Sequence, residues 1–456
     1  MNEKFRGLLQ YMSGKRVAVL GMGVSNTPLI RLLLDCGACV TVRDCKTRIE
    51  LGALADAFPG AALVLGDKYL ENLDEEIIFK TPGMRPDVPE LNAARLRGSC
   101  VTSEMEVFFR ICPSKIIGVT GSDGKTTTTT IIYEMLKAAG VNAFVGGNIG
   151  APLLDRAGEM TDSDVCVLEL SSFQLMTMDV SPDVAVITNI APNHLDMHTS
   201  MDEYIDAKRN VYKHNKNARV VLNYDNKITR ELARDVASPV FFSRIEELSH
   251  GFCVRGGMIC NGATPILDVH DIKIPGAHNV ENYLAAIAAL DGMVPNDVIV
   301  YVARTFGGVA HRMEHVRSFR GAEYYNDSIA SSPTRTIAGL RSFQCPVILI
   351  AGGYDKNIPF DVLGPEIIAH VKALVLVGAT ASKIRDCVVN AAGYNPDVLP
   401  IIECETFKSA VNTAASLARA GDVVTLSPAC ASFDLFKNFA ERGDAFRRLV
   451  NELCEE

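Results

Sequence analysis

The chain has 456 residues, 48% of them hydrophobic and 22% charged, and its formal net charge is −9 at pH 7. A chain of this length exceeds what one hydrophobic core organises, so about two to four domains are expected. The acidic balance disfavours a nucleic-acid partner, because a phosphate backbone demands a basic protein face. No apolar run approaches the roughly 18 residues of a membrane span, so no membrane partner is expected.

The amino terminus and the cysteines indicate the cellular compartment. The first residues, "MNEKFRGLLQYMSGK", lack the apolar segment of a signal peptide. The thirteen cysteines are an odd number scattered along the chain, which favours reduced thiols over a disulfide framework. Cys36 and Cys39 form a CxxC pair, but a structural zinc site needs four ligands and no second pair exists. We therefore expect plain thiols and a cytoplasmic location.

Strand and helix patterns alternate at the start of the chain. "RVAVLG" predicts a strand, "NTPLIRLLLDCG" a helix and "CVTVRD" a second strand. The connecting "GMGVSN" is G-x-G-x-x-G with Asn26 in place of the third glycine, and Asp44 follows at the end of the second strand. This spacing is typical of a dinucleotide fold, which makes NAD one candidate ligand. A tight turn without a ligand is the alternative for Gly21 and Gly23.

The next strand-to-helix connection, "IIGVTGSDGKTTTTT", resembles a phosphate-binding loop that lacks its first glycine. A Gly-rich turn between a buried strand and a helix directs backbone N–H groups at one spot, and the helix dipole adds positive potential. Lys125 would reach the outer phosphates, and the hydroxyl of Thr126 or Thr127 would reach Mg²⁺. The alternative is a plain turn capped by Ser122 or Asp123.

Two near-continuous apolar runs, "DVCVLEL" and "DVAVITNI", follow as expected for buried parallel strands. Glu169 ends the first run, where ligand-facing residues of open α/β sheets gather, and a carboxylate there suits Mg²⁺. His194 and His198 have the i, i+4 spacing of zinc ligands, but no third strong ligand follows at zinc-like spacing.

The same alternation returns in "PVILIAGG", "ALVLVG" and "DVVTLSP", while "GFCVRGGMICNG" is typical of a hairpin. Three blocks of strands predict an α/β protein of three domains. We expect a Rossmann-like domain over residues 1–103, a central P-loop-type mononucleotide-binding parallel sheet over 104–308, and a Rossmann-like domain over 309–456. The glycine pair Gly307-Gly308 suits a hinge at the second boundary.

Several segments occur in one order and spacing along nearly the whole chain: "TGSDGKT" (120–126), "GGNIG" (146–150), "ELSSFQL" (169–175), "NIAPNHLDMH" (189–198), "YIDAKRNVY" (204–212), "HRME" (311–314) and "SPACASFDLFKNFAERGDAF" (427–446). Together they resemble the Mur ligases, the amide-forming enzymes of bacterial cell-wall synthesis. "SSFQL" and "SPACASFD" are most similar to the family member that joins D-glutamate to UDP-N-acetylmuramoyl-L-alanine. The resemblance implies ATP-driven amide formation through an acyl phosphate, by a monomer with two Mg²⁺ ions.

The resemblance also implies a set of contacts for each ligand. For ATP these are Gly121, Ser122, Asp123, Gly124, Lys125, Thr126, Thr127, Asn282, Arg312 and Asp327. For the UDP-linked substrate, in place of NAD, they are Val24, Ser25, Asp44, Thr81, Pro82, Gly83, Asn148 and Ser171. For D-glutamate they are Ser331, Lys356, Ser432 and Phe439. The implied metal ligands are Thr126, Glu169, His194 and Lys208, and the implied catalytic residues are Lys125, His194, Lys208, Arg312 and Lys356.

Lys208 is the unusual member of this set, because a lysine is itself a cation. The family makes this lysine a metal ligand by carbamylation with CO₂, which requires a neutral amine and therefore a depressed pKa. Without the resemblance, a surface helix lysine is the simpler interpretation. His198 has no role implied by the resemblance.

The carboxyl-terminal third departs from the family pattern. Where the family has D-S-K-A-T-N-P, this chain has Ile329 for the lysine and Ser331-Ser332 for the Thr-Asn. A nucleotide-binding regulator without turnover therefore stays open as an alternative. A sister ligase for another amino acid is disfavoured by "SPACASFDLF" and by the absence of a D-N-P-R-like motif. Ser432 also suits a helix N-cap.

Overall fold

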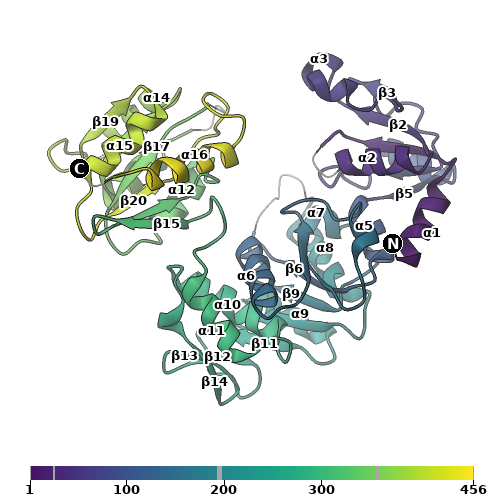
Figure 1. Cartoon of the computed structure of the whole chain (residues 1–456), viewed down its shortest axis with the longest axis horizontal. Coiled ribbons are helices and arrows are strands. Elements are labelled where there is room, and N and C mark those ends of the chain that lie inside the picture. Colours follow the sequence, from purple (N-terminus) through teal and green to yellow (C-terminus); the bar gives the residue numbers. More distant parts are fainter. Residues whose placement is uncertain (1, 24–25, 193–197, 356–358, 455–456) are drawn as a thin grey trace. The chain divides into compact units, whose positions relative to one another are not determined.

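A computed structural model describes residues 2–23, 26–192, 198–355 and 359–454 (Figure 1). The chain forms two compact units. The first comprises Met1–Asp271 with Val280–Ala303, and the second comprises Ile272–Asn279 with Arg304–Glu456. In the described part of the chain, no helix is long and apolar enough to cross a bilayer.

The first sheet has five parallel strands in the order β3-β2-β1-β4-β5. Its strands are β1 (Arg16–Leu20), β2 (Cys39–Asp44), β3 (Ala62–Leu65), β4 (Ile77–Phe79) and β5 (Cys100–Thr102), accompanied by α1 (Glu3–Met12), α2 (Asn26–Asp35), α3 (Arg48–Leu51) and α4 (Pro89–Leu96). The strand order reverses between β1 and β4. Ligands of open α/β sheets bind in the crevice outside the carboxyl ends at such a switch point.

The second sheet has nine strands in the order β14-β13-β12-β11-β10-β9-β6-β8-β7. Its strands are β6 (Lys115–Thr120), β7 (Ala143–Gly147), β8 (Val165–Glu169), β9 (Val184–Ile187), β10 (Arg219–Asn223), β11 (Val240–Ser243), β12 (Phe252–Arg255), β13 (Met258–Asn261) and β14 (Thr264–Asp268). All neighbours are parallel except β12–β13 and β13–β14, so the predicted hairpin is confirmed. The order reverses on the two sides of β6, whose carboxyl end leads into the Gly-rich loop.

Helices of different length accompany this sheet: α5 (Glu104–Ile111), α6 (Lys125–Ala138), α7 (Ser172–Leu175), α8 (Met201–Lys213), α9 (Lys227–Leu232), α10 (Ala277–Ala289) and α11 (Asn296–Thr305). The first two sheets share one hydrophobic core. Phe5 and Met12 of α1 belong to the same buried cluster as Met105 and Phe108 of α5. This shared core explains why the two sheets form a single compact unit.

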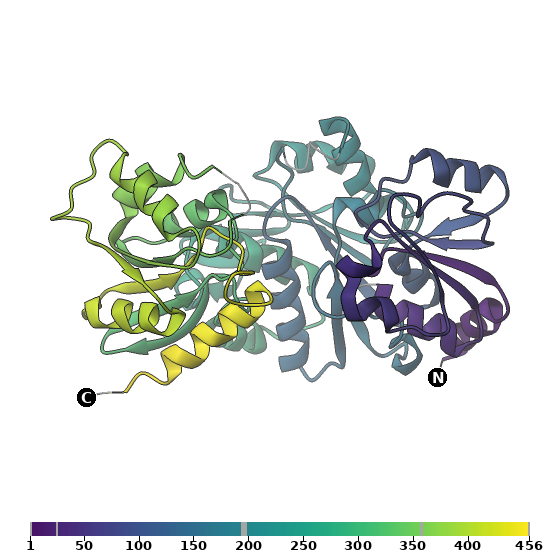
Figure 2. The same cartoon turned by 90° about the horizontal axis from the view of Figure 1, so that it is seen from above.

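The third sheet, in the second unit, has six strands in the order β15-β16-β20-β17-β18-β19, parallel except for β15–β16. Its elements are β15 (Glu314–Phe319), β16 (Ala322–Asn326), β17 (Val347–Ala351), β18 (Val371–Val377), β19 (Ile401–Cys404), β20 (Val423–Leu426), α12 (Pro333–Leu340), α13 (Leu363–His370), α14 (Ala381–Val389), α15 (Phe407–Leu417) and α16 (Phe439–Asn451). Side chains of β17 alternate between two cores. Ile348 and Ile350 belong to the buried cluster that includes α15 and α16, whereas Val347 and Leu349 belong to the one that includes α12, α13 and α14. Figure 2 shows the second unit, green to yellow, with helices on both sides of its strands.

Candidate active site

The loop between β6 and α6 requires glycine at two positions. Gly121 has φ 154°, and a Cβ there would lie 1.9 Å from Thr188 Oγ1. Gly124 has φ 77° in the left-handed region, and a Cβ there would lie 2.4 Å from Asn282 Oδ1. Gly121 and Gly124 are therefore required for two reasons: their positive φ values, and the close packing that leaves no room for a Cβ.

Residues at the carboxyl end of β9 hold this loop. Asp123 N donates to Asn189 Oδ1 at 2.9 Å, and Ser122 N donates to the Asn189 carbonyl at 2.9 Å. Thr188 Oγ1 donates to the Asp123 carbonyl at 2.5 Å. Sequence reasoning did not assign Thr188 or Asn189 to the loop, although polar residues at the end of an apolar strand were a signal for them.

The alternative of a capped turn is wrong. Among the described residues no side chain caps α6, because Ser122 Oγ is bonded elsewhere, 2.9 Å from both the Ala191 carbonyl and Tyr204 Oη. Lys125 Nζ donates to the carbonyls of Gly121 at 3.0 Å and Ser122 at 2.8 Å. The lysine therefore covers the loop, at the positive end of a fourteen-residue helix, as an anion-binding site requires.

Glu169 ends β8 beside this loop, in register with Val119 of β6. The residue is 2% exposed, and its Oε1 accepts a hydrogen bond from Asn148 Nδ2 at 2.7 Å. Oε2 is buried and has no hydrogen-bond donor within the described residues. A buried carboxylate oxygen without a donor is costly, and a hard cation such as Mg²⁺ would satisfy it. The side chain therefore fits a magnesium ligand.

Lys208, on α8, is 1% exposed, so the interpretation as a surface lysine is wrong. Its Nζ donates to the Gly121 carbonyl at 2.8 Å and to Thr120 Oγ1 at 3.3 Å, and it lies 4.6 Å from the centre of the Tyr204 ring. Burial, and after it the charge of Lys125, lowers the pKa of Lys208 well below its usual value. The amine thus lies at the phosphate loop, in surroundings that favour its neutral form.

At the switch point of the first sheet, the side chains of Asp44 and Asn26 form hydrogen bonds with the backbone. Asp44 Oδ2 accepts from Met22 N at 2.7 Å, and Oδ1 accepts from Lys46 N at 2.9 Å. Asn26, in the place of the third glycine, is 2% exposed and donates to the carbonyls of Leu20 and Gly21 at 2.9 Å each. Asn26 therefore stabilises the turn by hydrogen bonds that a glycine cannot make.

The segment after β4 lies across the same switch point, since the Thr81 Cβ is 3.6 Å from the Cβ position of Gly21. The structure thus brings Thr81 to the loop that begins at Gly21 and to the sheet edge where Asp44 ends β2. Ser171, in contrast, is the N-cap of α7 and forms a capping box with Gln174. Its contact with the UDP-linked substrate stays a prediction.

In the second unit, Arg312 lies in a tight turn whose neighbours His311 and Met313 both have left-handed backbones, with φ 62° and 44°. Asp327 holds this turn. Its Oδ1 accepts from Met313 N at 3.3 Å and its Oδ2 accepts from Ser427 Oγ at 2.8 Å. Burial raises the pKa of Asp327 to about 7. These contacts give Asp327 a role in positioning Arg312, and its contact with the ribose of ATP stays a prediction.

Of the predicted D-glutamate residues that the structure describes, Ser331 and Ser432 lie on two loops of the second unit and Phe439 begins α16. Ser331 is half-buried, Ser432 is 2% exposed and Phe439 is 40% exposed. Ser432 is not a helix N-cap, because its carbonyl begins a turn and the cap of α16 is Asn438, six residues later. The isolated "ASFDLF" suggested a cap, but the chain does not continue as a helix there.

Arg442, on α16, joins these two loops and was not predicted. It is 3% exposed and donates to the carbonyls of Ser328 at 2.8 Å, Ala431 at 3.0 Å and Cys430 at 3.1 Å. Its acceptors are neutral, and burial lowers its pKa to about 10. A buried cation with these bonds fixes the spacing between the 327–331 and 427–432 loops.

Four predicted residues lie outside the described ones: Val24, Ser25, His194 and Lys356. Among the described residues, no three His, Cys, Asp or Glu side chains converge on a metal position. The thirteen cysteines are all unpaired, as expected for reduced thiols. His198, which had no predicted role, is 2% exposed, with Nε2 2.9 Å from Ser172 Oγ.

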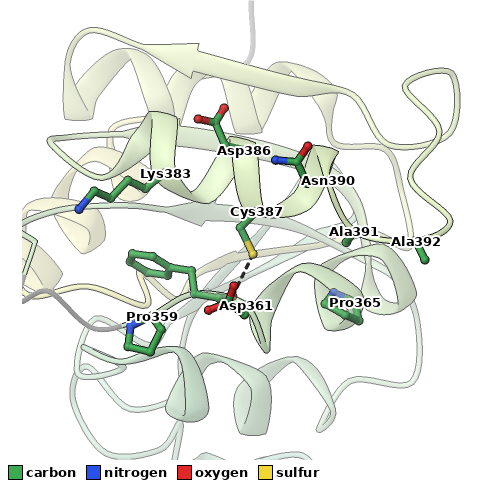
Figure 3. A pocket seen from close by; sticks show the side chains of 10 residues that line it. Pro359, Asp361, Pro365, Lys383, Asp386, Cys387, Asn390, Ala391 and Ala392 are labelled. Carbon is green, nitrogen blue, oxygen red and sulfur yellow. Dashed lines mark hydrogen bonds between the residues drawn. The ribbon is translucent and has the colours of Figure 1, made fainter.

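A separate cavity of about 660 Å³ lies in the second unit between the residues before α13 and helix α14 (Figure 3). Lys383, Asp386 and Cys387 of α14 line one side, and Cys387 Sγ donates to the Phe360 carbonyl at 2.9 Å. Of the predicted site residues that the structure describes, none lines this cavity. It is therefore not assigned to a substrate.

Comparisons with known proteins agree with the geometry. Residues 119–290 match the family described as Mur ligase middle domain, and residues 311–430 match Mur ligase, glutamate ligase domain. A protein of Acetivibrio thermocellus named UDP-N-acetylmuramoylalanine–D-glutamate ligase is 52% identical, over 99% of this chain and 100% of its own. A Clostridium kluyveri protein of the same name is 49% identical over the same shares.

Solved structures show the same fold. A UDP-N-acetylmuramate-alanine ligase of Thermotoga maritima matches with a TM-score of 0.60 at 18% identity, over 96% of this chain and 99% of its own. A UDP-N-acetylmuramoyl-L-alanyl-D-glutamate–2,6-diaminopimelate ligase matches with a TM-score of 0.57 at 15% identity, over 97% of this chain and 93% of its own. At these identities the likeness is one of fold.

Proposed function

Because this chain belongs to the Mur ligase family, we propose that it joins D-glutamate to UDP-N-acetylmuramoyl-L-alanine with ATP as the energy source. The observation that carries the proposal is the juxtaposition of the phosphate loop, the buried Glu169 and the buried amine of Lys208. This constellation suits phosphoryl transfer, in which catalysis consists mainly of positioning and charge stabilisation.

The reaction has two steps. An oxygen of the terminal carboxylate of UDP-N-acetylmuramoyl-L-alanine bonds to the γ-phosphorus of ATP, the bond from that phosphorus to the β,γ-bridging oxygen breaks, and ADP leaves. The amine of D-glutamate then attacks the carbonyl carbon of the acyl phosphate. Inorganic phosphate leaves, and the amine gives up a proton as the amide forms. Exclusion of water protects the acyl phosphate from hydrolysis.

Named residues have separate tasks in this proposal. Lys125 binds the outer phosphates of ATP, together with the backbone N–H groups of the loop. Arg312, a permanently charged and planar group, binds a phosphate oxygen. Ser331, Ser432, Phe439 and Lys356 hold D-glutamate. The turn at Thr81, Pro82 and Gly83 and the loop at Val24 and Ser25 hold the UDP-linked substrate at the switch point.

Two Mg²⁺ ions are proposed, one held by Thr126 and Glu169, the other by His194 and a carbamylated Lys208. Bound Mg²⁺ offsets negative charge on the phosphoryl group. The depressed pKa of Lys208 supports the carbamate, because only the neutral amine reacts with CO₂ to give a carbamate and a proton. Without that modification, an ammonium so close to the loop would repel a cation.

Further parts of the proposal concern the whole chain. We place the domain boundaries after residues 103 and 308. The first boundary lies between β5 and α5, and the second lies between α11 and β15. We expect a monomer in the cytoplasm, and the thirteen unpaired cysteines support that compartment.

The decisive experiment supplies ATP, Mg²⁺ and UDP-N-acetylmuramoyl-L-alanine with one amino acid at a time, and measures phosphate release and product mass. Release that depends on D-glutamate is the expected result. Turnover with a diamino acid, or with L-alanine on the UDP-sugar acid, would instead identify a sister ligase. Nucleotide binding without any turnover would identify a regulator, the alternative that the Ile329 departure left open.

A further inference from the structure

We propose that Arg85 is a positioning residue for the UDP-linked substrate, because it fixes the segment that carries Thr81, Pro82 and Gly83 to helix α8. The inference rests on the proposed function in that this segment contacts the substrate. Arg85 follows the turn by two residues, and its partner Glu203 lies in the first turn of α8, more than a hundred residues later.

The contact between the two segments is a two-pronged ion pair. Arg85 donates to both carboxylate oxygens of Glu203, at 2.8 and 3.1 Å. It also donates to both oxygens of Asp87, at 2.9 and 2.8 Å. The side chains of Arg85 and Glu203 are 25% and 27% exposed. The guanidinium of Arg85, and then Thr199 N, lowers the pKa of Glu203 to about 2, so the pair is charged at every pH of interest.

Glu203 also contacts residues next to helices of the second sheet. Its Oε2 accepts from Thr199 N at 2.6 Å and lies 3.5 Å from His198 Nδ1. The Nε2 of the same histidine is 2.9 Å from Ser172 Oγ in α7. One carboxylate therefore connects the segment after β4 with the ends of both α7 and α8.

The same end of α8 holds the phosphate loop. Tyr204, the next residue after Glu203, places its Oη 2.9 Å from Ser122 Oγ. Lys208, one turn further, donates to the Gly121 carbonyl at 2.8 Å. Consecutive turns of one helix thus contact the proposed substrate segment on one side and the phosphate loop on the other. A shift of Arg85 away from Glu203 would change the distance between the two ligand-binding segments.

Arginine is suited to this task by its shape. Its planar fork meets a carboxylate with two parallel hydrogen bonds, which fixes direction as well as distance, whereas lysine supplies a point charge on a flexible stem. A partly exposed ion pair of this kind contributes little to stability. Loss of Arg85 should therefore leave the fold intact and act on substrate placement.

The test compares Arg85→Ala and Arg85→Lys with the unmodified protein and with Arg110→Ala. Arg110 is the control, because it also pairs with a carboxylate on the exposed surface of the same unit: its Nη2 donates to the two oxygens of Asp179 at 2.6 and 2.8 Å. We expect Arg85→Ala to raise the KM and the calorimetric Kd for the UDP-linked substrate about tenfold. The KM values for ATP and D-glutamate and the Tm should match those of the control, and Arg85→Lys should be intermediate.

A double-mutant cycle tests whether the effect passes through Glu203. If it does, Arg85→Ala/Glu203→Ala should bind the UDP-linked substrate no more weakly than the weaker single variant. Fully additive losses would overturn the proposal, as would an unchanged Kd in Arg85→Ala, or equal rises in the KM of all three substrates. Absence of ligase turnover in the unmodified protein would instead contradict the proposed function, and the calorimetric arm would still report on Arg85.

Discussion

Burial shifts the pKa values of two residues of the candidate site in opposite directions. Burial lowers the pKa of Lys208 and raises that of Asp327 to about 7, because low polarity disfavours whichever form is charged. Both groups are therefore shifted toward neutrality at pH 7, although one is a base and the other an acid. The two shifts lead to different experiments.

For Lys208, we expect Lys208→Ala to be nearly inactive, because it removes the anion that the carbamate would supply. Acetate or another short-chain acid should partly restore turnover by occupying the vacated position. In the unmodified protein, removal of CO₂ should lower the activity and bicarbonate should recover it. The measurement is phosphate release, with circular dichroism as the control for folding. Substantial activity in Lys208→Ala, or a folded variant that no short-chain acid rescues, would leave the carbamate without support.

For Asp327, the prediction concerns stability against pH. Its pKa is about 3.8 in the unfolded chain and about 7 in the folded one, so the folded state binds the proton more tightly. The resulting stability is fully present below about pH 4 and is lost as the pH rises through about 7, at about 1.4 kcal/mol per pKa unit. The free energy of unfolding of the unmodified protein, minus that of Asp327→Asn, should therefore fall by a few kcal/mol from pH 4 to 8. Urea unfolding in the absence of nucleotide measures this difference. A difference that stays constant from pH 4 to 8 would contradict the prediction.

At the scale of elements, the phosphate loop owes its shape to the strand beside it as much as to its own glycines. Thr188 and Asn189 follow β9, a strand parallel to β6, so their polar groups meet the loop at the same edge of the sheet. The first glycine of the usual motif is absent, yet the loop forms because these neighbours hold it.

Substitution of Gly121 tests that packing. In Gly121→Ala the new Cβ would meet Thr188 Oγ1 at 1.9 Å, so the loop must move and ATP binding should weaken at least about tenfold. Gly140→Ala is the control, because Gly140 also has a positive φ, 80°, but nothing lies within 4 Å of its Cβ position. Both variants carry backbone strain of about 1–3 kcal/mol. Calorimetry with a non-hydrolysable ATP analogue should distinguish them, and equal affinities in the two variants would refute the packing argument.

At the scale of the whole molecule, the first two sheets share a core and the third has its own. The turn after β1 and the segment after β4 both belong to the first unit. The contacts proposed for the UDP-linked substrate are therefore contained in one compact unit, whereas Arg312, which we propose binds a phosphate oxygen, belongs to the second.

A fragment ending at Ala303 should consequently fold, bind UDP-N-acetylmuramoyl-L-alanine and show no turnover. It should not bind NAD⁺, because both oxygens of Asp44 accept backbone hydrogen bonds, whereas a dinucleotide site uses this carboxylate for ribose hydroxyls. Thermal unfolding followed by circular dichroism checks the fold, and calorimetry checks the two ligands. Micromolar binding of NAD⁺ would show that the G-x-G segment has been misinterpreted, and loss of UDP-substrate binding in a folded fragment would show that the second unit contributes to it.

Local patterns determined the elements and the loop. The apolar runs predicted β6, β8, β9, β17, β18 and β20, and the helix expected after the Gly-rich turn is α6. The sequence alone indicated the Gly-rich turn, the position of Glu169 at the end of a strand, and the likeness to Mur ligases. These features depend on residues close in the chain, or on the order of short segments along it, and such information is present in any linear sequence.

Tertiary structure alone decided which distant residues meet. It brought Lys208 against the Gly121 carbonyl, Thr188 and Asn189 against the loop, and Arg442 against three carbonyls. These contacts join residues between 11 and 114 positions apart. It also decided against a cap at Ser432, since the following turn leads to a helix that begins at Phe439. The physical reason is the same in each case. Burial and hydrogen-bond partners are properties of packed surfaces, and the pKa values of Lys208 and Asp327 exist only once those surfaces have formed.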